Sequence, residues 1–330
     1  GEEFKEQGYL KEFEDTKYVS EETIDLLNQL MAWGVKVYHP TGRRATNINR
    51  IQRFDKSTEI YENIECKLAD IPTDGVACEH GNIILYPNKE SNIWEVDLQY
   101  ANQFRDVIGD LSYINTNYAK ELSASVKSMS KKEYEELFEA HKKNGLLWDF
   151  ENILTEEAAK MNNKYNAELE QYGVKLGITS KGRLTSTRLG FVDVNGKMLE
   201  KGKSKKSFPD ELYQGVYEQC MNILESSGDY NHDLKIVSHS GFIDILPAKA
   251  GKGAAVDYLC NINGISRENT VGIGDDFNDR EMLEAVAIPY TFSDSNVSNL
   301  VKENGGKLFG ELKDKHDATN QMLKHILNYT

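Results

Sequence analysis

Three carboxylates and an amide lie close together in the segment Gly274–Asp279, which reads Gly-Asp-Asp-Phe-Asn-Asp. Like charges this close repel one another unless a cation lies among them. Oxygen-only ligands suit a hard ion, and Mg²⁺ binds through one or two carboxylates, waters and substrate phosphate. The segment is therefore a candidate Mg²⁺ site, although an Asp-rich turn that caps a helix would have the same sequence. A calcium EF-hand is disfavoured because its alternating Asp pattern and closing Glu are absent.

A lysine at position 252 is the second candidate for chemistry. Lys252 belongs to the segment Lys249–Gly253, which reads Lys-Ala-Gly-Lys-Gly and precedes an expected helix. An ammonium group at such a place can neutralise a transferring phosphoryl group and shield a nucleophile from like-charged neighbours. A solvated lysine beside a glycine turn is the other interpretation. The Walker pattern, Gly-x-x-x-x-Gly-Lys-Ser/Thr, is not matched.

Hydroxyl groups provide two further candidates. Thr41, Gly42 and Arg43 follow one another, and the threonine hydroxyl with the backbone amides can hold phosphate oxygens, or the three residues can simply make a turn. Ser238–Gly241 reads Ser-His-Ser-Gly. Because the Gly-x-Ser-x-Gly elbow is absent there, we reject a serine nucleophile.

The elements expected around Thr41 explain how it is positioned. Ser20 is a good N-cap for an amphipathic helix that Gly34 ends. Val35–Tyr38 follows as a short strand. The loop that begins at Thr41 therefore lies at the carboxyl end of a strand, where ligands bind in open α/β sheets.

The rest of the chain alternates between two patterns. From about residue 103 to 231 the sequence predicts a separate α+β lobe, and from Leu234 the βα alternation returns. We therefore expect an α/β core interrupted by one inserted lobe. The predicted elements are a hairpin (Gly75–His80 and Ile83–Tyr86), helices at 131–142, 155–172, after Pro209, at Gly253–Cys260, at Asn278–Val286 and at the C-terminus, and strands at Lys175–Thr179, Thr185–Val194, Leu234–Val237, Phe242–Leu246, Val271–Gly274 and Ala287–Phe292.

The order of these motifs carries more information than any one of them. Thr-Gly-Arg after an early strand, Lys-Gly before a late helix, and Gly-Asp-Asp-Phe-Asn-Asp after the next strand resemble motifs two, three and four of the haloacid-dehalogenase phosphatases. Ser240–Gly253 and the turn Glu79–Asn82 resemble the sucrose-phosphatase and Cof-type branch. The resemblance implies a Rossmann-like parallel-sheet core from 1–100 and 233–330, with an inserted α+β cap domain at 101–232.

The resemblance also implies aspartyl-phosphate chemistry on a small phosphorylated metabolite, with a sugar phosphate as the expected substrate class. Thr41 and Lys252 would be the catalytic residues, and Gly42, Arg43 and Asn278 would bind substrate or organise the loop. Asp275 would bind Mg²⁺, with Asp279 as a direct or water-mediated partner. A sugar phosphomutase and a non-catalytic ligand-binding or interaction domain are the alternative functions.

The first motif of that family, Asp-x-Asp on the opening strand, is not visible. Residues 6–17 read Glu-Gln-Gly-Tyr-Leu-Lys-Glu-Phe-Glu-Asp-Thr-Lys, without Asp-x-Asp in any register. Glu12 and Glu14 have a similar outline, but a glutamate would displace the attacking oxygen by about a methylene, and errors near 1 Å can cost about a hundredfold in rate. Either the aspartate pair lies upstream of this chain or it has been lost, and we favour the first.

Composition limits the partners. The net charge of -14 repels phosphate backbones and anionic lipids, so we expect neither nucleic acid nor membrane as a partner. No apolar run is long enough for a membrane span. The four cysteines are widely spaced and form no CxxC pair, which favours reduced thiols and a cytoplasmic location.

Overall fold

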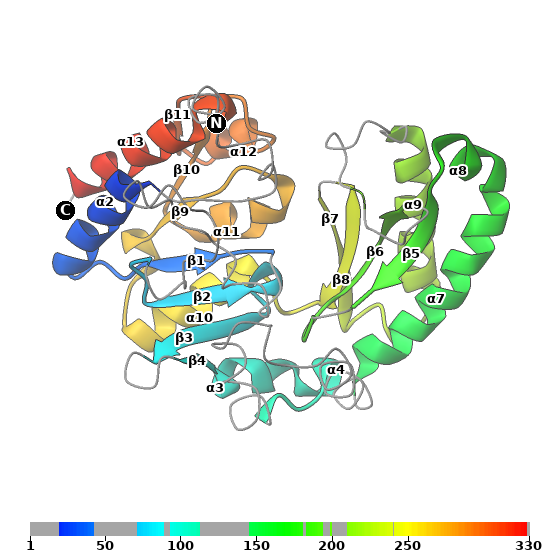
Figure 1. Ribbon diagram of the computed structural model, residues 1–330. Coiled ribbons are helices and arrows are strands. Elements are labelled where there is room, and N and C mark those ends of the chain that lie inside the picture. Colours follow the sequence, from blue (N-terminus) through cyan, green and yellow to red (C-terminus); the bar gives the residue numbers. More distant parts are fainter. Residues whose placement is uncertain are drawn as a thin grey trace, which may run out of the picture.

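The computed structural model describes residues 20–42, 71–88, 93–112, 145–180, 183–193, 199, 210–239 and 241–328. These residues form two lobes, which lie side by side in Figure 1. The first lobe contains two parallel or mixed sheets with helices around them, and the second contains an antiparallel sheet with helices on one side. The predicted α/β fold class is therefore confirmed.

The first lobe contains two sheets. In one, β1 and β2 are parallel, and β2, β3 and β4 form an antiparallel meander. In the other, β9, β10 and β11 are all parallel, in the order β11-β10-β9. The strands are β1 (Tyr38–Pro40), β2 (Gly75–Cys78), β3 (Ile83–Asn88), β4 (Ile93–Val96), β9 (Val271–Ile273), β10 (Ile288–Phe292) and β11 (Lys307–Phe309).

Helices of the first lobe surround these sheets. The longest are α2 (Glu21–Ala32), α10 (Lys252–Asn263) and α13 (Lys315–Leu327). The shorter helices are α3 (Leu98–Ala101), α4 (Arg105–Ile108), α11 (Arg280–Ala285) and α12 (Ser298–Glu303), with 3-10 turns η3 (Glu79–Gly81), η4 (Asn102–Phe104), η6 (Arg267–Asn269), η7 (Phe277–Asp279) and η8 (Leu312–Asp314).

Helix α2 begins where the sequence predicts. The Ser20 hydroxyl accepts a hydrogen bond from the Thr23 amide at 3.1 Å, as expected of an N-cap. Helix α13 packs against α2, and the two helices are adjacent in Figure 1. A buried polar contact joins them, because the Thr23 hydroxyl donates to Asn320 Oδ1 at 2.7 Å. The amide of Asn320 in turn donates to Glu22 at 2.9 Å.

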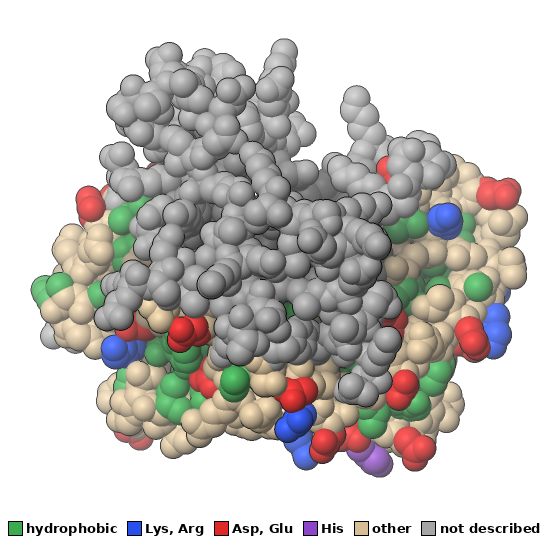
Figure 2. Space-filling view, turned by 60° about the horizontal axis from the view of Figure 1, so that its bottom comes forward, with side chains coloured by type: hydrophobic (Ala, Val, Ile, Leu, Met, Phe, Trp, Pro, Cys, Tyr) green, Lys and Arg blue, Asp and Glu red, His purple; other side chains and the backbone are tan. Residues whose placement is uncertain are grey.

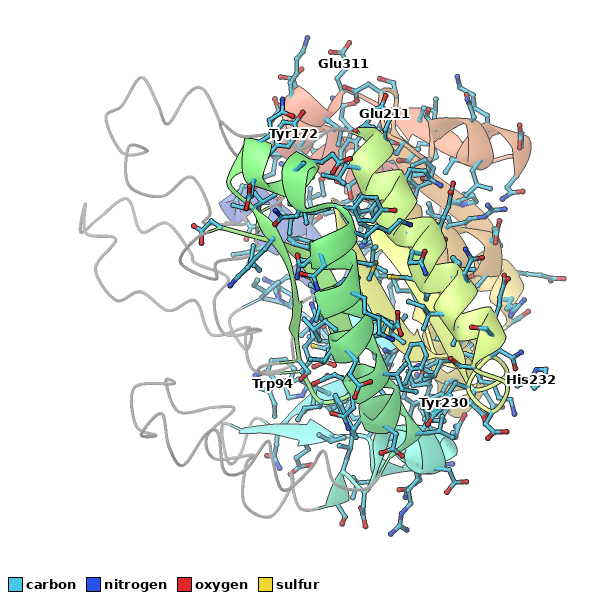
Figure 3. The ribbon with its side chains drawn as sticks, turned by 90° about the vertical axis from the view of Figure 1, so that its right-hand side faces the viewer. Trp94, Tyr172, Glu211, Tyr230, His232 and Glu311 are labelled. Carbon is cyan, nitrogen blue, oxygen red and sulfur yellow. The ribbon has the colours of Figure 1, made fainter. Side chains whose placement is uncertain are left out.

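The second lobe is one antiparallel sheet in the order β5-β6-β8-β7. Figure 3 shows α7 and α9 side by side in front of this sheet, with Tyr172 near one end of the pair and Tyr230 near the other. The Phe150 and Tyr230 rings lie 5.4 Å apart. The elements are α7 (Leu146–Lys164), α8 (Asn166–Tyr172), α9 (Asp210–Ser226), β5 (Lys175–Thr179), β6 (Thr187–Val192), β7 (Leu234–His239) and β8 (Phe242–Pro247).

Strand pairing differs from the predicted division of the chain at residue 233. Strand β8 pairs with β6 in the second lobe and β7 pairs with β8, and among the described strands neither pairs with β9 or β1. Both strands were expected from their apolar sequence, which does not say which sheet an isolated strand joins. β8 is also the link back to the first lobe, because α10 begins soon after it. The division into 1–100, 101–232 and 233–330 otherwise stays a prediction.

Two smaller expectations have other outcomes. The strand before Thr41 covers Tyr38–Pro40 instead of Val35–Tyr38. The helix predicted at 131–142 lies outside the described residues. No helix in the described part of the chain is long and apolar enough to cross a membrane.

The buried contact between α2 and α13 gives a stability prediction. Replacing Asn320 with Ala leaves the buried Thr23 hydroxyl without this acceptor, and we expect a loss of about 1–3 kcal/mol in the free energy of unfolding, measured in urea. The exposed neighbour Gln321 is the control, and Gln321→Ala should change stability by less than about 0.5 kcal/mol. Equal effects of the two substitutions would contradict the importance of the contact.

Candidate functional site

The aspartate-rich loop after β9 is folded around one carboxylate. Asp279 Oδ2 accepts hydrogen bonds from the amides of Asp275 at 2.9 Å and Asp276 at 3.2 Å, which turns the chain back on itself before α11. Gly274 is needed here, because a Cβ at this position would lie 2.5 Å from the Asp279 Cβ. Asn278 lies in the same turn, half-buried. The carboxylate of Asp279 thus organises the loop.

Lys252 is buried at the start of α10 and forms an ion pair with Asp279. Its Nζ donates to Asp279 Oδ1, and the two side chains are only 4% and 9% exposed. Burial alone would raise the pKa of Asp279, but the Lys252 charge, its hydrogen bond and the two backbone amides outweigh burial and lower that pKa. Asp279 is therefore ionised at neutral pH, and Lys252 is not the solvated lysine of the alternative interpretation.

Thr41 and Gly42 lie where β1 ends. The Thr41 amide donates to the Ala77 carbonyl at 2.8 Å, and the Thr41 carbonyl accepts from the His80 amide at 2.9 Å. Gly42 lies against the His80 imidazole, since a Cβ on Gly42 would be 2.9 Å from the ring. Arg43 lies outside the described residues.

The turn η3 brings these loops together. Its last residue, Gly81, lies directly on the loop before α10, because a Cβ there would be 2.7 Å from Gly251 O and from Lys252 N. Contacts therefore run without a break from the Thr41 loop through η3 to Lys252, and from Lys252 through Asp279 to Asp275. Contacts thus link residues that are far apart in the sequence, and the candidate site of Thr41, Gly42, Lys252, Asn278, Asp275 and Asp279 stays a prediction.

Asp275 and Asp276 are less buried than Asp279. The carboxylate of Asp275 pairs with Lys315 at 2.6 Å, and these side chains are 36% and 49% exposed. Asp276 Oδ1 accepts from the Phe277 amide at 2.8 Å and from Asn296 at 2.9 Å. Among the described residues, no group of three or more His, Cys, Asp or Glu side chains is arranged to hold a metal ion. Asp275 still suits Mg²⁺, which needs as few as one carboxylate when waters and a phosphate complete its shell.

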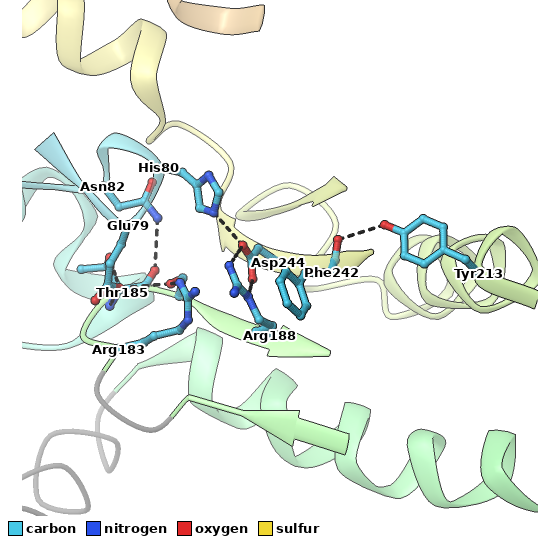
Figure 4. Close-up of polar contacts among 10 residues, drawn as sticks. Glu79, His80, Asn82, Arg183, Thr185, Arg188, Tyr213, Phe242 and Asp244 are labelled. Carbon is cyan, nitrogen blue, oxygen red and sulfur yellow. Dashed lines mark hydrogen bonds and ion pairs between the residues drawn. The ribbon is translucent and has the colours of Figure 1, made fainter. Parts of the chain in front are cut away.

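The sequence did not reveal two groups of residues around this site. Lys315 comes from α13, and nothing in its local sequence indicates that it contacts Asp275. Glu79 and His80 belong to a turn that was noted only for its resemblance to a family motif. Both are buried, 0% and 2% exposed, and make the contacts drawn in Figure 4. Their burial depends on the second lobe, which local sequence does not specify.

Comparison with known proteins identifies the family. A family model described as haloacid dehalogenase-like hydrolase matches residues 13–304, so the chain belongs to the haloacid dehalogenase-like hydrolases. A predicted phosphatase from Haemophilus influenzae is 33% identical over 66 residues, which is 20% of this chain and 24% of that protein. The chain thus matches about a quarter of the length of this curated relative.

Solved structures that match over most of the chain are more distant in sequence. A phosphatase of the haloalkanoate enzyme superfamily from Bacteroides thetaiotaomicron is 15% identical, with a TM-score of 0.47 over 95% of this chain and 90% of that one. The sucrose-phosphatase of Synechocystis sp. PCC6803, solved with sucrose and phosphate, is 13% identical, with a TM-score of 0.47 over 94% of both chains.

The buried pair predicts a pH-dependent loss of stability. Asp279→Asn leaves the Lys252 charge buried without its partner, which costs about 3–5 kcal/mol at pH 7. Folding lowers the pKa of Asp279, so the ionised carboxylate stabilises the folded protein. This stabilisation is present above the unfolded pKa of about 3.9 and is lost as pH falls through the folded pKa. The difference in the free energy of unfolding between the parent and Asp279→Asn, measured in urea, should therefore become smaller below about pH 4.

The control for this measurement is Asp257→Asn, which removes an exposed pair with Arg267. Exposed pairs contribute about 0–1 kcal/mol, so this variant should unfold almost like the parent. If Asp279→Asn lowers the free energy of unfolding at pH 7 no more than Asp257→Asn does, the Lys252–Asp279 pair does not stabilise the fold as proposed.

Proposed function

We propose that this protein is a Mg²⁺-dependent phosphomonoester hydrolase that acts on a small phosphorylated metabolite, with a sugar phosphate as the expected substrate. The observation that supports this function is the unbroken run of contacts from Thr41 through η3 and Lys252 to Asp275. In this proposal a hydroxyl, a backbone amide, an ammonium group and a carboxylate that can hold a cation act on one phosphoryl group. These are the groups that bind and stabilise a transferring phosphoryl group.

Each residue has a distinct role in this proposal. The Thr41 hydroxyl and the Gly42 amide bind phosphoryl oxygens, and Arg43, which the sequence predicts to bind substrate, lies outside the described residues. Lys252 offsets the charge of the phosphoryl group, and Asn278 helps to shape the loop. A dianionic substrate needs such local cations, because the chain as a whole carries a net charge of -14. On the face shown in Figure 2, the acidic side chains of the described residues are scattered and do not gather in one patch.

Asp275 is the proposed direct Mg²⁺ ligand, and Asp279 holds Lys252 and the loop in position. Both oxygens of Asp279 are engaged, one with Lys252 and the other with two amides. Asp275 has one oxygen on Lys315, and both of these side chains reach solvent. When bound, Mg²⁺ would neutralise the phosphoryl oxygens and orient them.

The attacking carboxylate is not assigned to any described residue of this loop. Asp275, Asp276 and Asp279 are each engaged with lysine, amide or asparagine groups. The proposal therefore assigns the nucleophile and the general acid to none of these three aspartates. A cytoplasmic location stays a prediction, and the described cysteines, Cys78, Cys220 and Cys260, form no disulfide.

The test of function is phosphate release by the protein from a panel of sugar phosphates. We expect Mg²⁺-dependent release, reduced about 10- to 100-fold in kcat/KM by Thr41→Val, which removes one hydrogen bond to a charged oxygen. Thr155→Val, on the exposed side of α7, is the matched control and should leave the rate unchanged. Isomer formation instead of phosphate would indicate a phosphomutase, and binding without turnover would indicate a non-catalytic domain.

The metal assignment is tested separately by calorimetry. Asp275→Asn should weaken Mg²⁺ binding by at least about tenfold, because a neutral amide replaces the anionic ligand. Glu303→Gln removes an equal charge from the exposed surface of α12 and should leave the affinity unchanged. Equal Mg²⁺ affinity in the parent and in Asp275→Asn would contradict the assignment of Asp275 as the Mg²⁺ ligand.

A further inference from the structure

The turn η3 holds two residues in an uncommon backbone conformation. Glu79 has φ 50° and His80 has φ 64°, and they are the non-glycine residues with positive φ in the described part of the chain. This left-handed region is unfavourable for side chains with a Cβ, and it persists where surrounding contacts over-determine it. Both side chains are buried, although they are polar. The contacts that fix them therefore indicate what the turn does.

Glu79 reaches from the first lobe into the second. Its carboxylate accepts from the amides of Leu184 at 2.9 Å and Thr185 at 2.8 Å. It also accepts from the hydroxyls of Thr185 at 2.8 Å and Ser186 at 3.1 Å. A buried carboxylate with this many donors is well compensated for the loss of water. Glu79 thus holds the segment that leads into β6.

His80 makes a second crossing at the same turn. Its Nε2 lies 2.6 Å from Asp244 Oδ2 on β8, so an Nε2–H donates to this fully buried carboxylate. Arg188 on β6 holds the same carboxylate with two bonds, from Nε at 2.6 Å and from Nη2 at 2.7 Å. The Arg188 guanidinium also lies over the Phe242 ring, 4.3 Å from its centre. Figure 4 shows His80, Asp244 and Arg188 in this order from one lobe to the other.

On its other side, His80 contacts the loop proposed to bind phosphate. The His80 amide donates to the Thr41 carbonyl, and the imidazole lies against Gly42. The orientation of the imidazole is set by Asp244, and Asp244 is fixed by Arg188. The backbone that would bind phosphoryl oxygens therefore packs on a side chain whose position is determined in the second lobe.

We infer that His80 is a positioning residue that couples the second lobe to the phosphate-binding loop, through Asp244 and Arg188. When the second lobe is docked, His80 holds Thr41 and Gly42 in the geometry that binds phosphate. When the His80–Asp244 contact is lost, the loop loses this support. The inference rests on the proposed function, because it assigns phosphate binding to the Thr41 loop.

The test is calorimetry with inorganic phosphate as the probe, in the presence of Mg²⁺. Asp244→Asn should weaken phosphate binding about tenfold or more, although Asp244 lies in the other lobe. His80→Leu should do the same, and His80→Gln, whose amide can still donate to Asp244, should stay within about threefold of the parent. Mg²⁺ affinity measured without phosphate should be the same in all these variants, which a general loss of structure would not leave unchanged.

Two controls separate this route from a general loosening of the lobes. Asp229→Asn changes an exposed aspartate of the second lobe and should have no effect. Glu281→Gln removes the charge from a different contact between the lobes, the Lys235–Glu281 pair, which lies beside Gly251. If Glu281→Gln weakens phosphate binding as much as Asp244→Asn does, the route through His80 is wrong.

The outcomes also separate the inference from the proposed function. If the parent binds phosphate and both Asp244→Asn and His80→Leu bind it equally well, the coupling is wrong and the proposed function stands. If His80→Gln loses as much affinity as His80→Leu, the hydrogen bond to Asp244 is not what positions the loop. If the parent binds no phosphate, the proposed function fails and the inference fails with it.

Discussion

The buried pair between the Lys252 ammonium group and the Asp279 carboxylate joins the start of α10 to the loop after β9. Removing two charges from water is costly, and their attraction offsets this cost only when the geometry is good and the remaining lone pairs are bonded. Here the other oxygen of Asp279 accepts hydrogen bonds from two backbone amides. The same carboxylate therefore sets the position of Lys252 and the fold of the aspartate-rich loop. Any site at the end of β9 depends on it.

The turn η3 imposes a second constraint because three parts of the protein meet there. It contacts the Thr41 loop through the His80 amide, the loop before α10 through Gly81, and the second lobe through Glu79 and His80. Gly81 cannot carry a Cβ, because one would collide with the backbone at Gly251 and Lys252. Glu79 and His80 have positive φ angles, and both side chains contact the second lobe. Backbone strain at this turn is thus supported by buried polar contacts.

Local patterns predicted most of the elements and the main loops of the candidate site. The loop from Gly274 to Asp279 could be located because the signals for an apolar strand, a turn and a helix start follow one another in the sequence. Partner choice could not be predicted in the same way. The pairing of β8 with β6, the Lys315–Asp275 pair and the Glu79 contacts join segments that are far apart in the sequence. Neither periodicity nor capping signals specify such partners. The candidate site could therefore be proposed from residue type and motif order, whereas the contacts that support it could not.

The two aspartates predicted as metal ligands differ in how their charge is balanced. Asp279 is neutralised by Lys252 inside the protein, and breaking that pair would leave a charge without water. Asp275 is neutralised by Lys315 in a partly exposed pair, and such pairs contribute about 0–1 kcal/mol. A hydrated divalent cation can replace Lys315 at small cost, whereas replacing Lys252 would dismantle the loop. The same motif thus contains one carboxylate that can exchange its partner and one that cannot, and we propose the first as the direct Mg²⁺ ligand for this reason.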